Sequence, residues 1–322
     1  MAKTVVVALG GNAIIRSGQA GTHAEQVENA RAMAVAVCRM REAGWTVVLV
    51  HGNGPQVGNL AIQQEEAAHR VPELPLYWLG AMTEGHLGCL LTLALHDVGK
   101  GTLPGVVSIV THAVVDTEDP AFSRPTKPIG PFFDERQARR YATERGWVVG
   151  EDAGRGYRRL VASPRPQRFV EIDAVRALVE REMVVIAAGG GGVPVVADST
   201  GYRGVDAVID KDLAAQALAT ALQADALVMV TDVPRVLLDY GTPNARPIVE
   251  MTAEQARRHA ADGQFPEGSM GPKIEAAIQF VRGGGSVAVI TDAERACASL
   301  DVVPGVAPGP EVGTRIVATG RP

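Results

Sequence analysis

Three glycine-rich loops and two lysines are the residues of this chain whose types and spacing could do chemistry. Each loop follows an apolar run, and the loop residues of interest are Gly10, Gly11, Asn12, Gly52, Asn53, Gly54, Gly190 and Gly191. The lysines are Lys211, between Asp210 and Asp212, and Lys273, at the end of the run Gly268-Ser269-Met270-Gly271-Pro272. Bare backbone N–H groups and mobile ammonium groups suit phosphate oxygens. The combination predicts phosphoryl transfer.

Several familiar phosphate and catalytic motifs are missing from the sequence. It contains no G-x-x-x-x-G-K-[ST] loop and no G-x-G-x-x-G after the first apolar run, so a Walker-type NTPase and a dinucleotide-binding fold are unsupported. It also contains no G-x-S-x-G elbow and no protein-kinase H-R-D or D-F-G signature. The phosphate must therefore be handled in another way.

The loops Gly10-Gly11-Asn12 and Gly52-Asn53-Gly54 are expected to meet, because adjacent parallel strands place their carboxyl-end loops at one edge of a sheet. Glycine lets the backbone approach a ligand closely, and helix N-termini add positive potential. Any one of these loops, taken alone, is best interpreted as a tight turn. Three such loops, two with an embedded asparagine (Asn12 and Asn53), favour an anion site, since an amide side chain both donates and accepts.

The two lysines stand in unusual surroundings. Lys211 follows Val208–Asp210, which reads as a strand end, and the carboxylates of Asp206, Asp210 and Asp212 flank it. Lys273 lies in the first turn of a predicted helix, where a cation opposes the macrodipole by about 0.3–1 kcal/mol. A bound anion would offset that penalty. The alternative for either residue is an ordinary surface lysine. A functional role is favoured over this alternative, because a lysine at the N-terminus of a helix is unfavourable without a bound anion.

A further set of residues is a weaker signal for a nucleotide base. Thr231, Asp232 and Val233 end another predicted strand, and Tyr240, Pro243 and Asn244 follow. These residues could frame an adenine.

The order of predicted elements indicates an α/β fold with a mostly parallel sheet. Apolar runs typical of buried strands alternate with helical patterns. Thr22 and Glu25 predict a capping box for a helix that stops at Gly44, Thr252 and Gln255 predict another, and Asp173 is expected to cap a helix that runs to Arg181. The predicted strands are 5–9, 45–50, 106–110, 147–149, 157–162, 183–188, 226–231 and 286–290, with 311–317 as a last, edge-like strand.

The composition changes between residues 116 and 166, where Pro, Arg, Asp and Glu are frequent. This stretch is expected to be an insertion that protrudes from the main body. A solvated surface excursion is the plain alternative. Lys127, fixed between prolines and a glycine, favours a lid over the site, since long loops often carry function.

Composition and charge narrow the class of protein. The 322 residues are 46% hydrophobic and 21% charged, which is typical of a soluble globular protein. The net charge of −5, with no basic run, argues against a nucleic-acid partner. No apolar segment approaches the roughly 18 residues that span a bilayer. Three scattered cysteines, Cys38, Cys89 and Cys297, read as reduced thiols, so a cytoplasmic location is expected.

With these segments assembled, the chain resembles the carbamate kinases of the amino-acid kinase superfamily over essentially its whole length. The features shared across the superfamily are Gly10-Gly11-Asn12, Gly52-Asn53-Gly54, Asp210, Thr231-Asp232 and Lys273. The more specific segments are 51–58, 188–195, 207–214 and 268–273. The most discriminating segment is Pro125-Thr126-Lys127-Pro128-Ile129-Gly130-Pro131, which lies in the insertion.

The resemblance implies a three-layer αβα sandwich with a mostly parallel central sheet and a protruding inserted subdomain. One domain would span 1–322, with a lobe for carbamate or carbamoyl phosphate at 1–198, a lid at 116–166 and a nucleotide-binding lobe at 199–322. It further implies ATP, ADP and Mg²⁺ as cofactors, small-molecule substrates, a homodimer and a reversible transfer that the family runs towards ATP in arginine breakdown.

The resemblance also implies roles for single residues. Lys211 and Lys273 would bind the transferred phosphoryl group and the leaving oxygen, Asp210 would hold both ammonium groups, and Lys127 would close with the lid. The anion would lie on the backbone amides of Gly10, Gly11, Gly52 and Asn53, with Asn12, Gly54, Gly190 and Gly191 beside it. The nucleotide contacts would be Lys211, Thr231, Asp232, Val233, Tyr240, Met270, Gly271 and Lys273.

Two other functions stay open at this point. One is another amino-acid kinase that acts on a larger acceptor, such as glutamate, acetylglutamate or a nucleoside monophosphate, which the segment around Lys127 disfavours. The other is an inactive nucleotide-binding sensor, which would need only the binding loops and not Lys211, Lys273 and Asp210 together.

Overall fold

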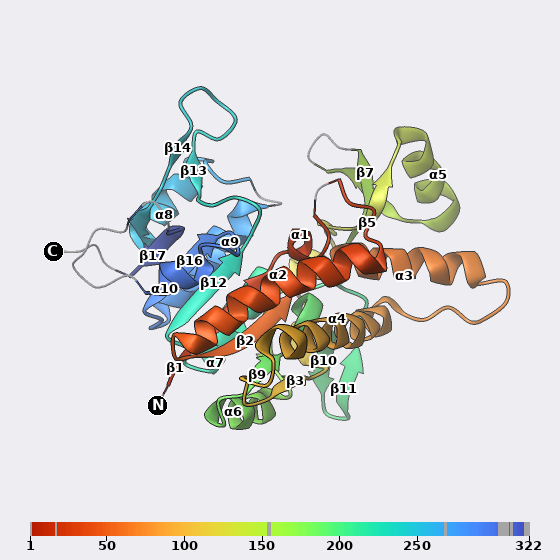
Figure 1. Ribbon diagram of the computed structural model, residues 1–322. Coiled ribbons are helices and arrows are strands. Elements are labelled where there is room, and N and C mark those ends of the chain that lie inside the picture. Colours follow the sequence, from red (N-terminus) through yellow and green to blue (C-terminus); the bar gives the residue numbers. More distant parts are fainter. Residues whose placement is uncertain are drawn as a thin grey trace.

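An eight-stranded sheet forms the centre of the protein (Figure 1). The computed structural model describes residues 2–16, 18–152, 156–266, 269–301, 309 and 312–318. The strand order is β15-β17-β16-β12-β1-β2-β9-β3. The bounds are β1 Lys3–Leu9, β2 Trp45–His51, β3 Val106–Ser108, β9 Val184–Ile186, β12 Ala226–Val230, β15 Glu250–Thr252, β16 Val287–Thr291 and β17 Thr314–Val317.

All neighbouring strands of this sheet pair in parallel except β16 and β17. The predicted mostly parallel α/β sheet is therefore confirmed. The expectation of an edge strand at 311–317 is wrong for its described part, because β17 lies between β15 and β16. Glu311 lies outside the described residues.

Helices cover both faces of the sheet, which confirms the three-layer sandwich. Side chains of β1 alternate: Val5, Val7 and Leu9 pack against one helical layer, and Val6 and Ala8 against the other. The first layer is α2 (His23–Glu42), α4 (Leu76–Gly99) and α10 (Ala296–Leu300). The second layer is α6 (Ile172–Glu180), α7 (Lys211–Ala221), α8 (Ala253–Ala261) and α9 (Met270–Arg282).

Local capping sets where these helices start. Thr22 with Glu25 and Thr252 with Gln255 form the two predicted capping boxes, at the starts of α2 and α8. The expectation that Asp173 caps α6 is wrong. The residue before this helix is Glu171, whose side chain makes no cap, and Asp173 lies inside the first turn, where its charge suits the helix dipole.

A second sheet lies beside the second helical layer. Its order is β11-β10-β4-β8, with bounds β4 His112–Val115, β8 Pro166–Phe169, β10 Val193–Asp198 and β11 Gly201–Gly204. The expected lobe boundary at 198/199 falls in the turn of the β10–β11 hairpin. A two-stranded ribbon, β13 (Leu237–Leu238) and β14 (Arg246–Pro247), follows β12. Residues 208–210, expected to end a strand, have no regular structure.

The insertion forms a small subdomain that projects beside α3 (Gly54–Ala67), as the yellow-green elements of Figure 1 show. Its sheet order is β5-β7-β6, with bounds β5 Lys127–Phe133, β6 Val148–Glu151 and β7 Tyr157–Val161, and α5 spans Glu135–Arg145. Phe133, Tyr141 and Trp147 form its aromatic core. We call residues 127–161 the lid subdomain. β5 was not predicted as a strand because it contains two prolines, which an edge strand such as β5 tolerates.

Candidate active site

The carboxyl end of the central sheet faces the lid subdomain across a cavity of ≈ 410 Å³. Strands β1 and β2 are adjacent and parallel, so the loops that follow them meet at one edge, as predicted. Of the predicted residues, those that line the cavity are Gly52, Asn53, Gly54, Lys127, Gly190 and Lys211. The loop at the end of β2, the four-glycine loop, the lid subdomain and the start of α7 therefore come together around one cavity.

Two of the loops lock together through Asn53 and Gly190. Gly190 has φ 65°, and a Cβ atom there would lie 2.1 Å from Asn53 Nδ2, so only glycine fits. The Asn53 amide donates to Thr83 Oγ1 at 2.8 Å, and Thr83 in turn donates to the carbonyl of Gly80 in α4. The close fit fixes the side chain of Asn53 at the cavity wall.

The four-glycine loop is held from beneath by buried groups of α4 and the segment before β4. Glu84 Oε2 accepts from the backbone N–H of Thr111 at 3.0 Å, and Thr111 Oγ1 accepts from the N–H of Ala188 at 3.0 Å. Burial raises the pKa of Glu84 well above its ordinary value, although backbone N–H groups act in the opposite direction. This carboxyl group supports the loop from beneath and does not itself line the cavity.

His51 ends β2 and is fully buried behind the same loop. Its Nδ1–H donates to the carbonyl of Gly52 at 3.1 Å, and a Cβ atom at Gly189 would lie 2.3 Å from His51 Nε2. Burial lowers the pKa of His51 from 6.5 to about 4, so the imidazole is neutral at neutral pH. His51 is a structural support of the loop.

Two of the backbone amides expected to hold an anion are already used. The N–H of Gly10 donates to Val230 O at 3.1 Å, and the N–H of Gly52 donates to Leu9 O at 3.0 Å. The expectation for these two amides is therefore wrong: the parallel sheet extends one residue further than its strands and takes them. Gly54 begins α3, whose first N–H groups have no acceptor within the helix. Gly11 and Asn12 begin the short helix α1 (Gly11–Ile14), and their role stays a prediction.

Asp212 holds both predicted catalytic lysines. Its Oδ2 atom lies 3.0 Å from Lys211 Nζ and 2.8 Å from Lys273 Nζ. Asp212 and Lys273 are buried and the side chain of Lys211 is 13% exposed, and Lys273 stands in the first turn of α9, as predicted. The expectation that Asp210 holds the two ammonium groups is wrong in this respect, because sequence spacing alone did not separate two carboxylates that flank one lysine.

Asp210 has a different pair of partners. Its Oδ1 atom accepts from the N–H of Asp212 at 2.9 Å and so caps α7, while its Oδ2 atom lies 2.6 Å from Lys127 Nζ. Burial alone would raise the pKa of Asp210, but Lys127 and Lys211 outweigh it and hold the pKa well below its ordinary value. Asp210 thus connects the lid subdomain to the start of α7.

The two lysines differ in electrostatic setting. Burial would lower the pKa of Lys211, but the Asp212 and Asp210 carboxylates outweigh it and the pKa lies above its ordinary value. The pKa of Lys273 lies below its ordinary value, because burial, with the charge of Lys211, outweighs Asp212. The three ammonium groups of Lys127, Lys211 and Lys273 outnumber the carboxylates of Asp210 and Asp212, and the positive charge left over would suit a phosphoryl group.

Arg158 is a cavity residue that sequence reasoning missed. Its Nε donates to the carbonyl of Gly130 at 2.9 Å and its Nη1 contacts Asp152 Oδ2 at 3.0 Å, so its guanidinium is fixed at the lid side of the cavity. The signal was present in Tyr157-Arg158-Arg159, a strand in which only alternate residues face the site.

Apart from Lys211, the residues expected on the nucleotide side do not line the cavity just described. Thr231 and Asp232 line a separate hollow of ≈ 660 Å³ between β12 and α2, which also holds Arg16 and Arg39. Tyr240 is exposed in the loop after β13. Met270 and Gly271 begin α9 next to Lys273, and Val233 follows Asp232 after β12. Nucleotide contact by these residues stays a prediction.

The described residues contain no group of three or more His, Cys, Asp or Glu side chains that could hold a metal ion. This donor set fits a magnesium ion that is carried by nucleotide phosphates, because Mg²⁺ usually keeps several waters and takes one or two carboxylates with substrate phosphates.

Comparison with known proteins gives consistent matches. The model of the amino acid kinase family matches residues 3–292. A carbamate kinase of Pyrococcus horikoshii is 45% identical over 305 residues, which cover 94% of this chain and 97% of the relative. A carbamate kinase of Giardia lamblia bound to citric acid superposes with a TM-score of 0.91 at 38% identity, over 98% of each chain. The same Giardia enzyme bound to AMP-PNP superposes with a TM-score of 0.87 at 39% identity, again over 98% of each chain.

Proposed function

The chain belongs to the amino acid kinase family, and from this premise we propose that it is a carbamate kinase, which transfers the γ-phosphoryl group of ATP reversibly to carbamate to give ADP and carbamoyl phosphate. The observation that carries the proposal is the cluster Lys211–Asp212–Lys273, which meets the lid residue Lys127 through Asp210 at a small cavity.

The chemistry needs little beyond alignment and charge. A carbamate oxygen already carries negative charge, so it attacks the γ-phosphorus without a general base, and the bond from that phosphorus to the bridging β-oxygen breaks to release ADP. The main tasks are to bring two anions together and to stabilise the charge on the phosphoryl group in flight. Lys211 and Lys273 are suited to that task, with Asp212 fixing both ammonium groups.

Magnesium is part of this proposal. When bound, it would neutralise phosphate charge and orient the β- and γ-phosphoryl groups of the nucleotide. The side chains best suited to bind this magnesium ion are the carboxylates of Asp210 and Asp212, whose depressed pKa values keep them ionised at neutral pH.

The charges of the cavity wall support an anionic acceptor. Lys127 and Arg158, two cations of the lid subdomain, line the cavity of ≈ 410 Å³ together with Lys211. Under this proposal residues 1–198 hold the acceptor, the insertion within 116–166 acts as the lid, and residues 199–322 hold the nucleotide.

The experiment that tests the function is ATP formation from ADP and carbamoyl phosphate with Mg²⁺. Wild-type protein is compared with Lys211→Ala, which removes one phosphoryl contact and is expected to lower turnover by about 10²–10³. ATP formation that depends on Lys211 supports the function. Turnover in Lys211→Ala equal to wild type, or no ATP from either protein, overturns it.

A homodimer and a cytoplasmic location belong to the same proposal. Trp78, Met82, Cys89 and Leu93 are exposed on α4 at spacings of four and seven residues, which places them on one face of the helix. A second copy would cover this stripe, and light scattering of wild type and Leu93→Glu tests it. The three cysteines are free thiols, and none of the described helices is long and apolar enough to cross a membrane.

A further inference from the structure

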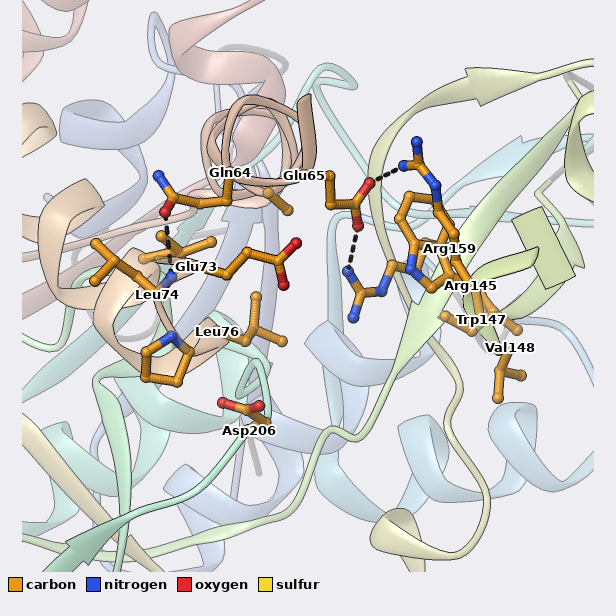
Figure 2. Close-up of a pocket in the computed structure, with 15 residues that line it drawn as sticks. Gln64, Glu65, Glu73, Leu74, Leu76, Arg145, Trp147, Val148, Arg159 and Asp206 are labelled. Carbon is orange, nitrogen blue, oxygen red and sulfur yellow. Dashed lines mark hydrogen bonds and ion pairs between the residues drawn. The ribbon is translucent and has the colours of Figure 1, made fainter. Parts of the chain in front are cut away.

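A second hollow, of ≈ 830 Å³, lies between the end of α3, the segment that leads into α4 and the lid subdomain (Figure 2). Its wall on the α3 side carries Glu65, and its wall on the lid side carries Arg145 and Arg159. Among the described residues, two of α3 pair with the lid subdomain: Glu65, and the 73% exposed Glu66, whose Oε1 atom lies 3.7 Å from Arg145 Nη2.

Glu65 is held by two arginines at once. Its Oε2 atom accepts a hydrogen bond from Arg145 Nη1, and its Oε1 atom lies 3.6 Å from Arg159 Nη1. The guanidinium carbons of Arg145 and Arg159 lie 5.4 Å and 4.7 Å from the centre of the Trp147 ring. Because Trp147 belongs to the aromatic core of the lid subdomain, the arginines move with that core.

The two ion pairs of Glu65 are less exposed to solvent than an ordinary surface ion pair. The side chain of Glu65 is only 16% exposed, and those of Arg145 and Arg159 are 29% and 27% exposed. In contrast, Glu135 and Arg139, a pair within the lid helix α5, are 59% and 79% exposed. A less exposed pair is screened less by water and salt, so the Glu65 contacts are the ones able to fix geometry.

The strand register connects Glu65 to Lys127. Arg159 on β7 stands opposite Ile129 on β5, and Lys127 is two residues further along β5, opposite Val161. The side chains at two-residue spacing in a strand point to the same side. Arg159, Ile129 and Lys127 therefore share the side of the lid sheet that meets α3, two residues apart along β5.

The face of α3 that meets the lid subdomain has one repeating pattern. Val57, Ala61 and Glu65 are four residues apart, and the first two pack with Ile129 in one apolar cluster. A Cβ atom at Gly58 would lie 1.9 Å from Gly130 Cα, so helix and lid strand touch there without side chains. Glu65 is the polar end of this seam, farthest from the cavity.

We propose that Glu65 is a positioning residue for the phosphoryl transfer: by anchoring Arg159 and Arg145 to α3, it holds strand β5 and thereby Lys127 at the cavity. The inference rests on the proposed function, because Lys127 acts there on carbamoyl phosphate. Glu65 touches no reacting group and acts through Lys127.

The test compares the KM values for carbamoyl phosphate and for ADP in wild type, Glu65→Gln and the control Glu135→Gln. Glu65→Gln keeps the shape of the side chain and removes its charge. We expect the KM for carbamoyl phosphate to rise about tenfold, with the KM for ADP changed less than twofold, since misplacement of a positioning group by about 1 Å costs up to about 10² in rate. Glu135→Gln is expected to match wild type in both constants.

A second arm separates positioning from general loosening. In a Lys127→Ala background, Glu65→Gln should have no further effect, because residues that act through one another are not additive. Independent effects that multiply, an equal rise in the KM for ADP, or an unchanged KM for carbamoyl phosphate would each overturn the proposal.

A third arm does not depend on activity. Hydrogen–deuterium exchange of residues 127–133 and 157–161 should be faster in Glu65→Gln than in Glu135→Gln, because the lid strands lose their anchor. Equal exchange overturns the anchoring. If wild-type protein forms no ATP from carbamoyl phosphate, the proposed function fails, and exchange alone then decides whether Glu65 anchors the lid subdomain.

Discussion

Lys127 Nζ, on the first residue of lid strand β5, lies 2.6 Å from Asp210 Oδ2, at the N-cap of α7. The contact joins the insertion to the segment that carries Lys211, across 83 residues of sequence. A phosphoryl group entering the cavity would compete with Asp210 for the same ammonium group. Lys127 is therefore an ion-pair partner of the main body and, under the proposed function, also a cation for the substrate.

Replacement of this lysine should affect the acceptor side of the reaction. Lys127→Ala removes a charge from the cavity wall and leaves the Lys211–Asp212–Lys273 cluster unchanged, so we expect kcat/KM for carbamoyl phosphate to fall by about 10² with the KM for ADP within twofold of wild type. Steady-state kinetics of ATP formation checks this, with Arg139→Ala on exposed α5 as the control. A large rise in the KM for ADP would contradict the lid role.

The two aspartates beside Lys211 should respond differently to loss of charge. Asp212→Asn leaves two buried ammonium groups without their carboxylate, so we expect a loss of about 3–5 kcal/mol in the free energy of unfolding and a fall in turnover of about 10²–10³. Asp210→Asn keeps a good helix cap and loses the pair with Lys127 and a longer-range attraction to Lys211, so its loss of stability should be smaller, about 1 kcal/mol. Urea denaturation and kcat of both variants give the comparison, and Asp210→Asn as unstable as Asp212→Asn would contradict the assignment.

The difference between these aspartates shows what the sequence could and could not predict. Buried strands, capping boxes and glycine loops follow from local patterns, so the sequence could predict the sheet, the helices on its two faces and the meeting of the loops that follow β1 and β2. Which carboxylate takes which lysine depends on the direction of each side chain at the start of α7. The N-cap position turns Asp210 towards its own helix and Lys127, and leaves Asp212 to the two lysines.

Long-range contacts of the lid subdomain were out of reach for a related reason. Glu65 and Arg145 are separated by 80 residues, and nothing in either local pattern marks the pair. β5 escaped prediction because its prolines disfavour a strand until the strand is known to be an edge. The hydrogen bonds that occupy the backbone N–H groups of Gly10 and Gly52 were likewise out of reach, because they depend on pairing between strands that are distant in sequence.

The contact of Gly58 with Gly130 predicts a sensitive position on α3. Gly58→Ala places a Cβ atom 1.9 Å from Gly130 Cα. This is a steric clash with the backbone of β5, so the lid subdomain must move away from the helix. We expect the KM for carbamoyl phosphate to rise at least tenfold, because Lys127 lies three residues from Gly130 on the same strand. Gly54→Ala is not a control, since Gly54 lines the cavity; Gly85→Ala in α4, where a Cβ atom meets open space, is the matched control. A Gly58→Ala protein with wild-type kinetics would show that the lid is not held by this contact.

Acid should destabilise the protein through His51. Its pKa is about 4 in the folded protein and about 6.5 in the unfolded chain, so between these values the unfolded state binds a proton that the folded state does not. The free energy of unfolding should therefore be unaffected by this group above pH 6.5, and should fall by about 1.4 kcal/mol per pH unit as the pH drops towards 4, about 3 kcal/mol in all. The depressed pKa values of Asp210 and Asp212 add a loss at still lower pH, so the histidine contribution must be isolated.

The isolating comparison is His51→Asn, whose amide can donate to the carbonyl of Gly52 and does not titrate. Its unfolding free energy at neutral pH should be lower than that of wild type, because an imidazole that fills the space behind Gly189 is replaced by a smaller side chain. The gap between the two proteins should then narrow from pH 6.5 to pH 4, since only wild type pays for keeping an imidazole neutral in the fold. Curves measured by urea denaturation that stay parallel over this interval would mean that His51 keeps an ordinary pKa, and that water reaches the space behind the four-glycine loop.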